Sequence, residues 1–283
     1  MSTATPLATA QLQGRTHRQR REGRSAGDRT LAVITVLVVL FLYLPLAVVI
    51  LYSFSSADVA VWPIEGYTLG WYGELAQDKE IQQALRLSVL IGIASSTVAV
   101  VLGTLAALAI DRFEFPGKAA LRYVAVLPIT LPGIVTGVAM LSFFSFLTWP
   151  MSRWTVIIGH ATFCIALVLN TVVARLGGLP RNISEASADM GAPPLRTFWR
   201  VTFPLIRPAI LAGAVLAFTL SFDEVIVSFF LQGREPTLPL LIWGRLRIGL
   251  SPEINAVATV IILVSLAAVL LSNRLSRQAT LGG

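Results

Sequence analysis

Long apolar runs, separated by shorter polar segments, dominate the pattern along the 283-residue chain. A helix needs about 20 mostly apolar residues to cross the roughly 30 Å of hydrocarbon in a bilayer. The runs that meet this requirement lie at approximately residues 31–54, 87–110, 121–147, 154–175, 206–230 and 254–272. The pattern predicts an all-α integral membrane protein with about six transmembrane helices.

The third of these runs, residues 121–147, contains residues that bend helices. Pro128, Pro132, Gly133 and Gly137 all fall within it. Such residues are tolerated in a membrane where neighbouring helices cover the backbone groups that the bend frees. We therefore expect a kinked helix that is packed in the interior.

The composition agrees with a membrane protein. Hydrophobic residues make up 55% of the chain and charged residues only 13%, and the mean hydropathy is +0.75. Soluble domains carry about 25% charged residues, so the composition excludes a disordered chain and argues against an ordinary soluble enzyme. The single cysteine excludes a disulfide framework and a cysteine-based metal cluster.

The net charge of +7 is distributed unevenly across the predicted membrane. Most of the 22 Lys and Arg residues fall in the tail and near residues 111–122, 175–207 and 273–283, which alternate spans place on one side. The positive-inside rule assigns that side, and both termini, to the cytoplasm. For the basic tail, residues 1–29, we expect disorder and a role in topology rather than nucleic-acid binding.

Motifs for intrinsic catalysis are missing from the sequence. No G-x-x-x-x-G-K-[ST] phosphate-binding loop occurs. The two histidines lie apart, His17 in the tail and His160 in the fourth span, so neither a metal-ligand pair nor a Ser-His-Asp grouping is supported. We interpret His160 as a hydrogen-bonded interior residue and Cys164 as small core packing. The sequence predicts no enzymatic activity, no cofactor and no metal site on this chain.

The connection between the fourth and fifth spans, residues 181–204, is longer than packing requires and has internal order. Ser184 can cap a helix that begins at Glu185, Gly191 allows a reversal, and Pro193-Pro194 ends one helix and starts another. An apolar stripe at helical spacing follows, formed by Leu195, Phe198, Trp199 and Val201. Composition alone leaves this helix–turn–helix either an interfacial amphipathic element or a docking surface.

This connection resembles the EAA loop of ATP-binding-cassette (ABC) importer permeases. The matching positions are Glu185, Ala186, Ser187, Asp189, Gly191, Ala192, Phe198, Val201 and Pro204. Ser187 stands where the family has alanine, and Phe203 where leucine is usual. The resemblance implies a coupling helix that inserts into a cleft on a separate cytoplasmic ATPase, so ATP and Mg would be bound on that partner and not on this chain.

Further matches extend the resemblance over about residues 31–272. Asp111-Arg112-Phe113 with Gly117-Lys118 looks like the end of the second span in these permeases. Residues 218–230 and 237–260 are similar to the spermidine/putrescine branch. The resemblance implies a type I ABC importer permease fold over residues 30–276 in a prokaryotic cytoplasmic membrane. Its implied partners are a second permease subunit in a heterodimer, two ATP-binding subunits and an extracytoplasmic substrate-binding protein.

Two acids, Asp223 and Glu224, fall about two thirds of the way along the fifth predicted span. A charge at mid-membrane costs on the order of 2.5–3.5 kcal/mol, so these carboxylates are expected to face protein or water. Adjacent helical positions would let both carboxylates line one wall of a cavity. Carboxylates and ring faces together favour an extended polyamine, since each cation–π contact contributes about 0.5–2 kcal/mol. The other candidate pathway residues are Ser221, Phe218, Phe222 and Trp243.

Alternatives to this interpretation remain open. In one alternative, the two acids pair with Arg245, Arg247 or a basic residue of a partner subunit and hold an outer gate shut. In another, Trp243 belongs to the interfacial aromatic belt and not to the pathway. Gly133 stands where some polyamine permeases have an acid. Other cargoes handled by related permeases are ferric iron, thiamine and aminophosphonates. A secondary transporter or channel that works without ATP would need no long ordered inner loop.

Overall fold

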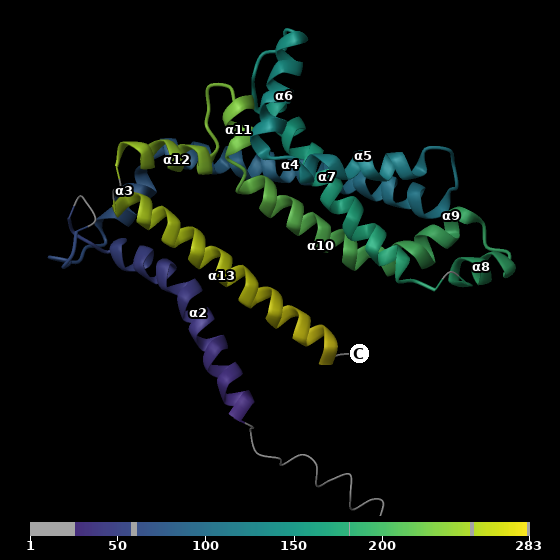
Figure 1. Cartoon of the computed structure of the whole chain (residues 1–283), viewed down its shortest axis with the longest axis horizontal. Helices are drawn as coiled ribbons and strands as arrows, with labels where there is room; N and C mark the ends of the chain where they lie inside the picture. Colours follow the sequence, from purple (N-terminus) through teal and green to yellow (C-terminus); the bar gives the residue numbers. More distant parts are fainter. Residues whose placement is uncertain (1–25, 58–60, 181, 250–251, 282–283) are drawn as a thin grey trace, which may run out of the picture. The chain divides into compact units, whose positions relative to one another are not determined.

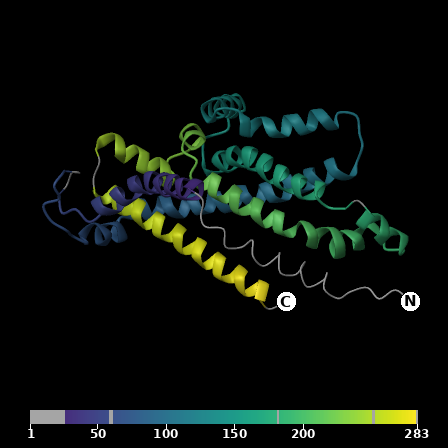
Figure 2. The same cartoon turned by 60° about the horizontal axis from the view of Figure 1, so that its bottom comes forward.

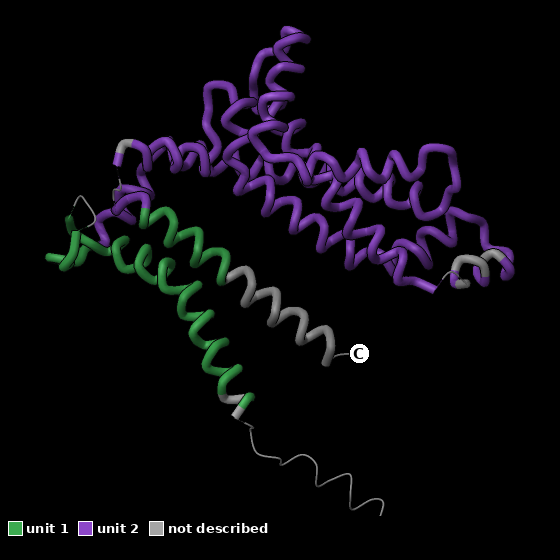
Figure 3. Tube along the Cα trace, in the orientation of Figure 1, with its two compact units in different colours: residues 1–68, 255–283 green, residues 69–254 purple. Residues whose placement is uncertain are grey.

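The computed structural model describes residues 26–57, 61–180, 182–249 and 252–281, most of them helical (Figure 1). The chain divides into two compact units, residues 1–68 with 255–283, and residues 69–254 (Figure 3). The predicted basic tail lies largely outside the described residues. Its last part, residues 26–29, is the start of the first helix rather than tail.

The first unit contains α2 (Ala26–Tyr52) and most of α13 (Pro252–Leu281). From Thr30 to Tyr52, α2 is long and apolar enough to cross a membrane, and its large side chains are exposed, Phe41 to 77%. Lipid tails are as apolar as these side chains, so such exposure is stable in a bilayer. In α13 the apolar part that can be assessed, Pro252–Leu266, is shorter.

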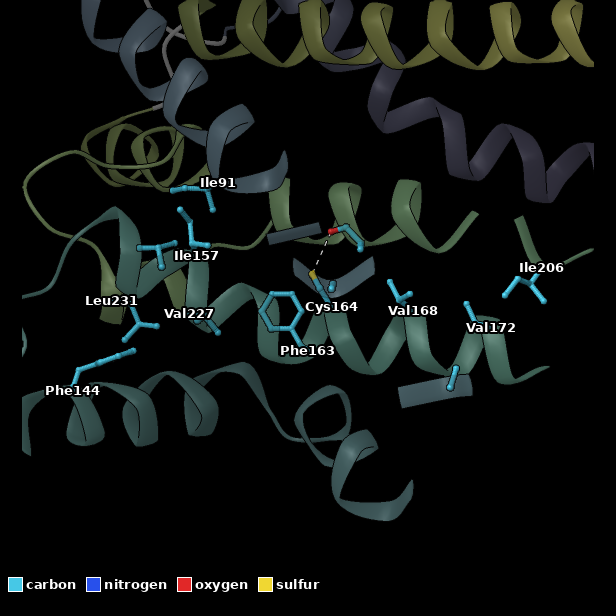
Figure 4. Close-up of a cluster of buried hydrophobic side chains, with 14 of the residues drawn as sticks. Ile91, Phe144, Ile157, Phe163, Cys164, Val168, Val172, Ile206, Val227 and Leu231 are labelled. Carbon is cyan, nitrogen blue, oxygen red and sulfur yellow. Dashed lines mark hydrogen bonds between the residues drawn. The ribbon is translucent and has the colours of Figure 1, made fainter. Parts of the chain in front are cut away.

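The second unit is built around α4 (Lys79–Arg112), α7 (Arg153–Gly177) and α10 (Phe203–Phe222), which pack against one another (Figures 1 and 2). Gly103 lets α4 and α7 approach closely, because a Cβ there would lie 2.9 Å from the Ile165 carbonyl oxygen. Small residues at such crossings allow the backbone packing that holds membrane helices together. The buried core continues along α7 (Figure 4), with labelled side chains Ile157, Phe163, Cys164, Val168 and Val172.

The second predicted span is longer than residues 87–110. A short helix, α3 (Gly70–Gln77), precedes it, and α4 begins at Lys79. The Asp78 carboxylate accepts from the backbone N–H groups of Glu80 and Ile81 at 2.8 and 3.1 Å. This N-cap satisfies backbone donors that have no partner within the helix and so sets its start.

The prediction of one kinked interior helix at residues 121–147 is wrong. The structure has two helices, α5 (Lys118–Thr130) and α6 (Gly133–Phe146), whose axes differ by 106°. Leu131 is extended because the following Pro132 disfavours helical backbone before it. Within this chain α5 has no buried residue and α6 buries only Gly137 and Phe144, since α7 covers only one side of α5 and α11 one side of α6.

The fifth predicted span is also broken. Helix α10 ends at Phe222, and a short helix, α11 (Ile226–Leu231), follows three residues that are not helical; α12 (Leu238–Ile248) comes next. Four described helices are long and apolar enough to cross a membrane, the last running from Pro194 to Phe222. The bent α5–α6 pair makes a fifth candidate, and the shorter α13 segment corresponds to the sixth predicted run.

Candidate functional site

The break between α10 and α11 places Asp223 and Glu224 outside regular helix. Asp223 is the last residue to donate a backbone bond into α10, to the Thr219 carbonyl oxygen at 3.2 Å. Glu224 Oε1 accepts from the N–H groups of Ile226 and Val227 at 2.8 and 3.0 Å. The predicted helical spacing of the two carboxylates is therefore wrong, because the Glu224 side chain caps the new helix instead.

The two acids differ in their surroundings. Asp223 is exposed, whereas Glu224 is half-buried, and within the described residues neither forms an ion pair. The first turn of α6 lies beside Glu224, since a Cβ on Gly133 would be 3.8 Å from Oε1. An acid at position 133 would thus add a second negative charge next to Glu224, and glycine leaves that space open.

A buried histidine connects the two sides of the break. His160 on α7 has no exposed surface, and its Nδ1 lies 2.8 Å from Ser221 Oγ. Its Nε2 lies 3.0 Å from Ser228 Oγ, and Ser228 Oγ donates to the Glu224 carbonyl oxygen at 2.9 Å. The interpretation of His160 as a hydrogen-bonded interior residue is confirmed. Sequence reasoning missed Ser228, although it lies seven residues after Ser221, which is close to two helical turns.

The aromatic candidates separate into two groups. Phe218 and Phe222 stack with ring centroids 5.9 Å apart on the last turns of α10. A Cβ on Gly92 would lie 2.9 Å from the Phe218 ring, so this ring packs against α4. Trp243 instead meets the Phe229 ring edge-on at 6.1 Å, and the Arg247 guanidinium lies 3.8 Å above it. Among the described contacts, none joins Trp243 to either acid.

Arg245 forms ion pairs, but not with Asp223 or Glu224. It pairs with Asp78 and Glu80 at 2.8 Å each and with Glu253 at 3.0 Å. The alternative in which Asp223 or Glu224 pairs with Arg245 or Arg247 of the same chain is therefore wrong for this structure. Asp78 and Glu80 lie close to Arg245 because α12 packs against the start of α4.

Arg245, Asp78, Glu80 and Glu253 form an ionic cluster in which opposite charges stabilise one another. Burial by itself would raise the pKa of Asp78, but the hydrogen bond and charge of Arg245 and the backbone N–H groups of Ile81 and Glu80 hold it below its usual value. Burial likewise disfavours the Arg245 cation, yet its pKa is raised by its hydrogen bonds to Glu80 and Asp78 and by the charge of Glu253. The cluster is thus a stable ionic link between α12, α4 and the first turn of α13.

The loop that resembles the EAA loop folds as two short helices. Helix α8 (Asn182–Asp189) is followed by a reversal at Gly191, whose φ of +76° favours glycine, and by α9 (Pro194–Thr197). The start predicted at Glu185 is wrong, because α8 begins at Asn182. The side chains of Ser184 and Glu185 lie outside the described residues. Ser187 Oγ is 2.9 Å from Thr197 Oγ1, so the serine that departs from the family pattern ties α8 to α9.

The candidate coupling residues around this reversal are mostly on the surface. Asp189, Ala186, Gly191 and Pro204 are exposed, whereas Ala192 and Phe198 are half-buried. Apolar side chains are exposed here too: Met190 to 81%, Leu195 to 70% and Trp199 to 57%.

The second short helix runs into the fifth span without a break. A π-helical turn, η2 (Phe198–Thr202), joins α9 to α10, so the predicted division between a loop ending at 204 and a span beginning at 206 does not exist. Arg112 Nη2 donates to Thr202 Oγ1 at 3.1 Å, and Arg175 Nε donates to the Leu205 carbonyl oxygen at 3.0 Å. Such π-helical turns are frequent at functional positions. Arg112 anchors this turn to the end of α4, and Arg175 anchors the first turn of α10 to the end of α7.

A metal site is not formed by side chains in the described part of the chain, where no three His, Cys, Asp or Glu residues lie close enough together. The features that remain are membrane-spanning helices, a break with two acids directly after one of them, and an ordered helix–turn–helix between the fourth and fifth predicted spans. Together they describe a helical protein embedded in a membrane.

Comparison with known proteins identifies the family. Residues 99–278 match the family described as "Binding-protein-dependent transport system inner membrane component", and the chain belongs to it. The putrescine transport system permease protein PotI of Escherichia coli (strain K12) is 40% identical over 239 residues, 81% of this chain and 84% of PotI. The spermidine/putrescine transport system permease protein PotC of the same strain is 35% identical over 244 residues, 86% of this chain and 92% of PotC.

Solved structures support the fold. A bacterial ABC transporter that imports the acidic polysaccharide alginate aligns with a TM-score of 0.66 at 16% identity, covering 89% of this chain and 98% of that one. The MetNI methionine ABC transporter aligns with a TM-score of 0.57 at 15% identity, covering 75% and 98%. The predicted all-α type I ABC importer permease fold is confirmed.

Membership of this family confirms the predicted class of protein. The chain is a multi-pass membrane protein and a transport subunit rather than an enzyme. It works together with other components of an ABC importer. An ATP-independent secondary transporter, which was the second alternative, does not agree with membership of a binding-protein-dependent transport family.

Proposed function

We propose that this chain is a permease subunit of an ABC importer for polyamines of the putrescine and spermidine type, and that it forms half of the translocation pathway. The relatives named above support the substrate class. The observation that carries the proposal is the exposed Asp223 carboxylate, which has no ion-pair partner among the described residues and interrupts an otherwise apolar span. A fixed anion there offers a protonated amine a partner where water is scarce.

The geometry divides the roles of the candidate residues. Glu224 is committed through Oε1 to capping α11, so Asp223 is the better amine ligand. The stacked rings of Phe218 and Phe222 supply faces for cation–π contact and for the methylene chain between amines. Ser221 supports the segment through His160 rather than contacting the polyamine. Trp243 serves as an aromatic side chain of the membrane interface.

The helix–turn–helix α8–α9 acts as the coupling element in this proposal. Its exposed apolar side chains, Met190, Leu195 and Trp199, form the surface that a separate ATPase covers, with the exposed Asp189 adding charge. We assign Glu185 to the same coupling element from its place in the sequence motif. ATP and Mg are bound on that ATPase, of which two copies drive transport. The remaining partners are a second permease subunit and an extracytoplasmic binding protein. The distribution of Lys and Arg supports an orientation with both termini in the cytoplasm.

Uptake of labelled putrescine tests the proposal, with the chain assembled with its cognate components in membrane vesicles. We expect Asp223→Asn to lower kcat/KM by about tenfold or more, the loss that accompanies removal of one charged hydrogen bond. Glu224→Gln keeps a capping oxygen and should cost only about threefold. Glu74→Gln is the matched control, because Glu74 is an exposed acid on α3. Unchanged uptake in Asp223→Asn would overturn the assignment.

A further inference from the structure

His160 connects α7 to both sides of the α10–α11 break. Ser221, which contacts Nδ1, lies two residues before Asp223, and Ser228, which contacts Nε2, lies four residues after Glu224. The imidazole has no exposed surface, and both serines are buried to at least 97%. One side chain therefore holds the two ends of the segment that carries the acids.

The direction of each hydrogen bond follows from the donors available. A serine hydroxyl has one hydrogen, and that of Ser228 is donated to the Glu224 carbonyl oxygen. Ser228 Oγ must then accept from the Nε2–H of His160. In the neutral imidazole Nδ1 is left as an acceptor for the Ser221 hydroxyl. The contacts assign one tautomer and give an unbroken chain of bonds from Ser221 to the backbone of Glu224.

The short helix after the break depends on tertiary contacts for its position. Helix α11 has only six residues, which is too short to be stable without tertiary contacts. At its far end Thr155 Oγ1, also on α7, donates to the Leu231 carbonyl oxygen at 2.7 Å. Apolar packing also holds α11, since Val227 and Leu231 are buried in the core and α11 packs against α6 and α7. Among the side-chain hydrogen bonds of the described residues, those of His160 alone join α7 to both sides of the break.

We propose that His160 is a positioning residue for transport: it sets the placement of Asp223 and Glu224 and thereby the affinity for the transported amine. This inference rests on the proposed function for the identity of the amine. The positioning of the two acids by His160 does not depend on which amine is transported, and it can be measured separately. The competing possibility is a polar core residue that contributes to stability alone.

Substitutions at position 160 distinguish these roles. Leucine removes both hydrogen bonds, whereas the glutamine amide keeps one donor and one acceptor. Cys164→Ala is the matched control, because Cys164 lies one turn along α7 and is fully buried in the core. Its Sγ donates to the Ala217 carbonyl oxygen of α10 at 3.4 Å and, among the described residues, has no hydrogen bond to residues 221–228 (Figure 4). In vesicles that contain the assembled importer, kcat and KM for putrescine are measured per assembled complex.

For His160→Leu we expect KM to rise about tenfold or more, because both buried hydrogen bonds are lost, with a smaller change in kcat. His160→Gln should recover most of the affinity, and Cys164→Ala should match the parent. A purely structural role would lower the amount of assembled complex while KM stayed the same, and that result would overturn the proposal. If His160→Leu does not assemble, Ser221→Ala answers the same question by removing only the bond to Nδ1. Ser228→Ala removes the bond to Nε2 together with the bond to the Glu224 carbonyl oxygen, so its effect should be larger.

A second measurement does not depend on the substrate. Asp223→Cys is introduced into the Cys164→Ala background, and its reaction rate with a cationic methanethiosulfonate reagent is followed. Adding His160→Leu should change this rate about fivefold or more, since the segment loses its link to α7. An unchanged rate would refute the positioning role. A changed rate with putrescine uptake indifferent to Asp223→Asn would leave the positioning role standing and reject the polyamine assignment.

Discussion

Replacing Arg245 with glutamine removes the cation that Asp78, Glu80 and Glu253 share. The three bonds differ in exposure: the Asp78 and Glu253 side chains are 19% and 24% exposed, and that of Glu80 is 60% exposed. A charged hydrogen bond contributes about 1.5–3 kcal/mol when protected, whereas an exposed ion pair contributes about 0–1 kcal/mol. Allowing for partial solvation, we expect a loss of about 3 kcal/mol.

Thermal unfolding of the detergent-solubilised protein measures this loss. About 2–4 °C is lost per kcal/mol in a chain of this size, so Tm should fall by about 6–12 °C. Arg247→Gln is the control on the same helix. It removes only the contact with the Trp243 ring, which is expected to contribute about 0.5–1 kcal/mol.

The pH dependence gives a second check on the same substitution. The pKa of Asp78 is lowered in the folded protein. The contribution of the Asp78 carboxylate to stability is therefore complete above its pKa in the unfolded chain, about 3.9. This contribution is lost as the pH falls through the pKa in the folded protein. The Tm difference between the parent and Arg245→Gln should be steady from about pH 5 to pH 8 and shrink below about pH 4.

Asp78→Asn keeps an oxygen for the N-cap of α4 and so separates the charge from the cap. In the Asp78→Asn background, Arg245→Gln should lower Tm by less than it does in the parent protein. Equal losses of Tm for Arg245→Gln and Arg247→Gln, or no coupling between Arg245 and Asp78, would refute the reasoning.

Three further substitutions test other parts of the structure. Gly103→Ala should lower Tm by about 2–12 °C, since its Cβ would meet the α7 backbone and overpacking costs about 1–3 kcal/mol. The control Gly73→Ala meets nothing within 4 Å and should have little effect. Gly191→Val should reduce ATPase binding in a pull-down assay, because φ at this position is +76° and valine rarely adopts that backbone conformation. Asparagine adopts it more readily, so Gly191→Asn should bind the ATPase more nearly as the parent protein does. Glu224→Ala should lower Tm by about 2–4 °C through loss of the α11 cap, which costs about 1 kcal/mol, and Glu224→Gln should lower it less.

Local features of the chain made much of the fold predictable. The apolar runs correspond to the helices of both units because the length needed to cross hydrocarbon is a property of a single segment. The reversal at Gly191 and the helix start at Pro194 were likewise predictable, since both depend on the conformational preferences of those residues alone. The resemblance of residues 181–204 to the EAA loop identified the family that the comparison confirms.

The break at Asp223 depends on partners that are distant in sequence. Residues 218–230 are apolar enough to continue a helix, and nothing in their spacing shows that the Glu224 side chain caps α11 or that His160, about sixty residues earlier, bonds to both flanking serines. The 106° angle between α5 and α6 similarly depends on α7 and α11 as well as on Pro132.

By itself, then, the sequence determined the class of protein, the approximate position of each span and the helix–turn–helix between the fourth and fifth. Hydrophobicity, backbone preference and motif spacing belong to single segments and can be assessed without neighbours. Only the tertiary structure decided that Glu224 caps α11 while Asp223 is exposed, that Arg245 pairs with Asp78, and that His160 joins the two ends of the break. Each of these pairings depends on which helix faces meet, because a buried polar group is stabilised by the partner that packing brings within hydrogen-bond distance.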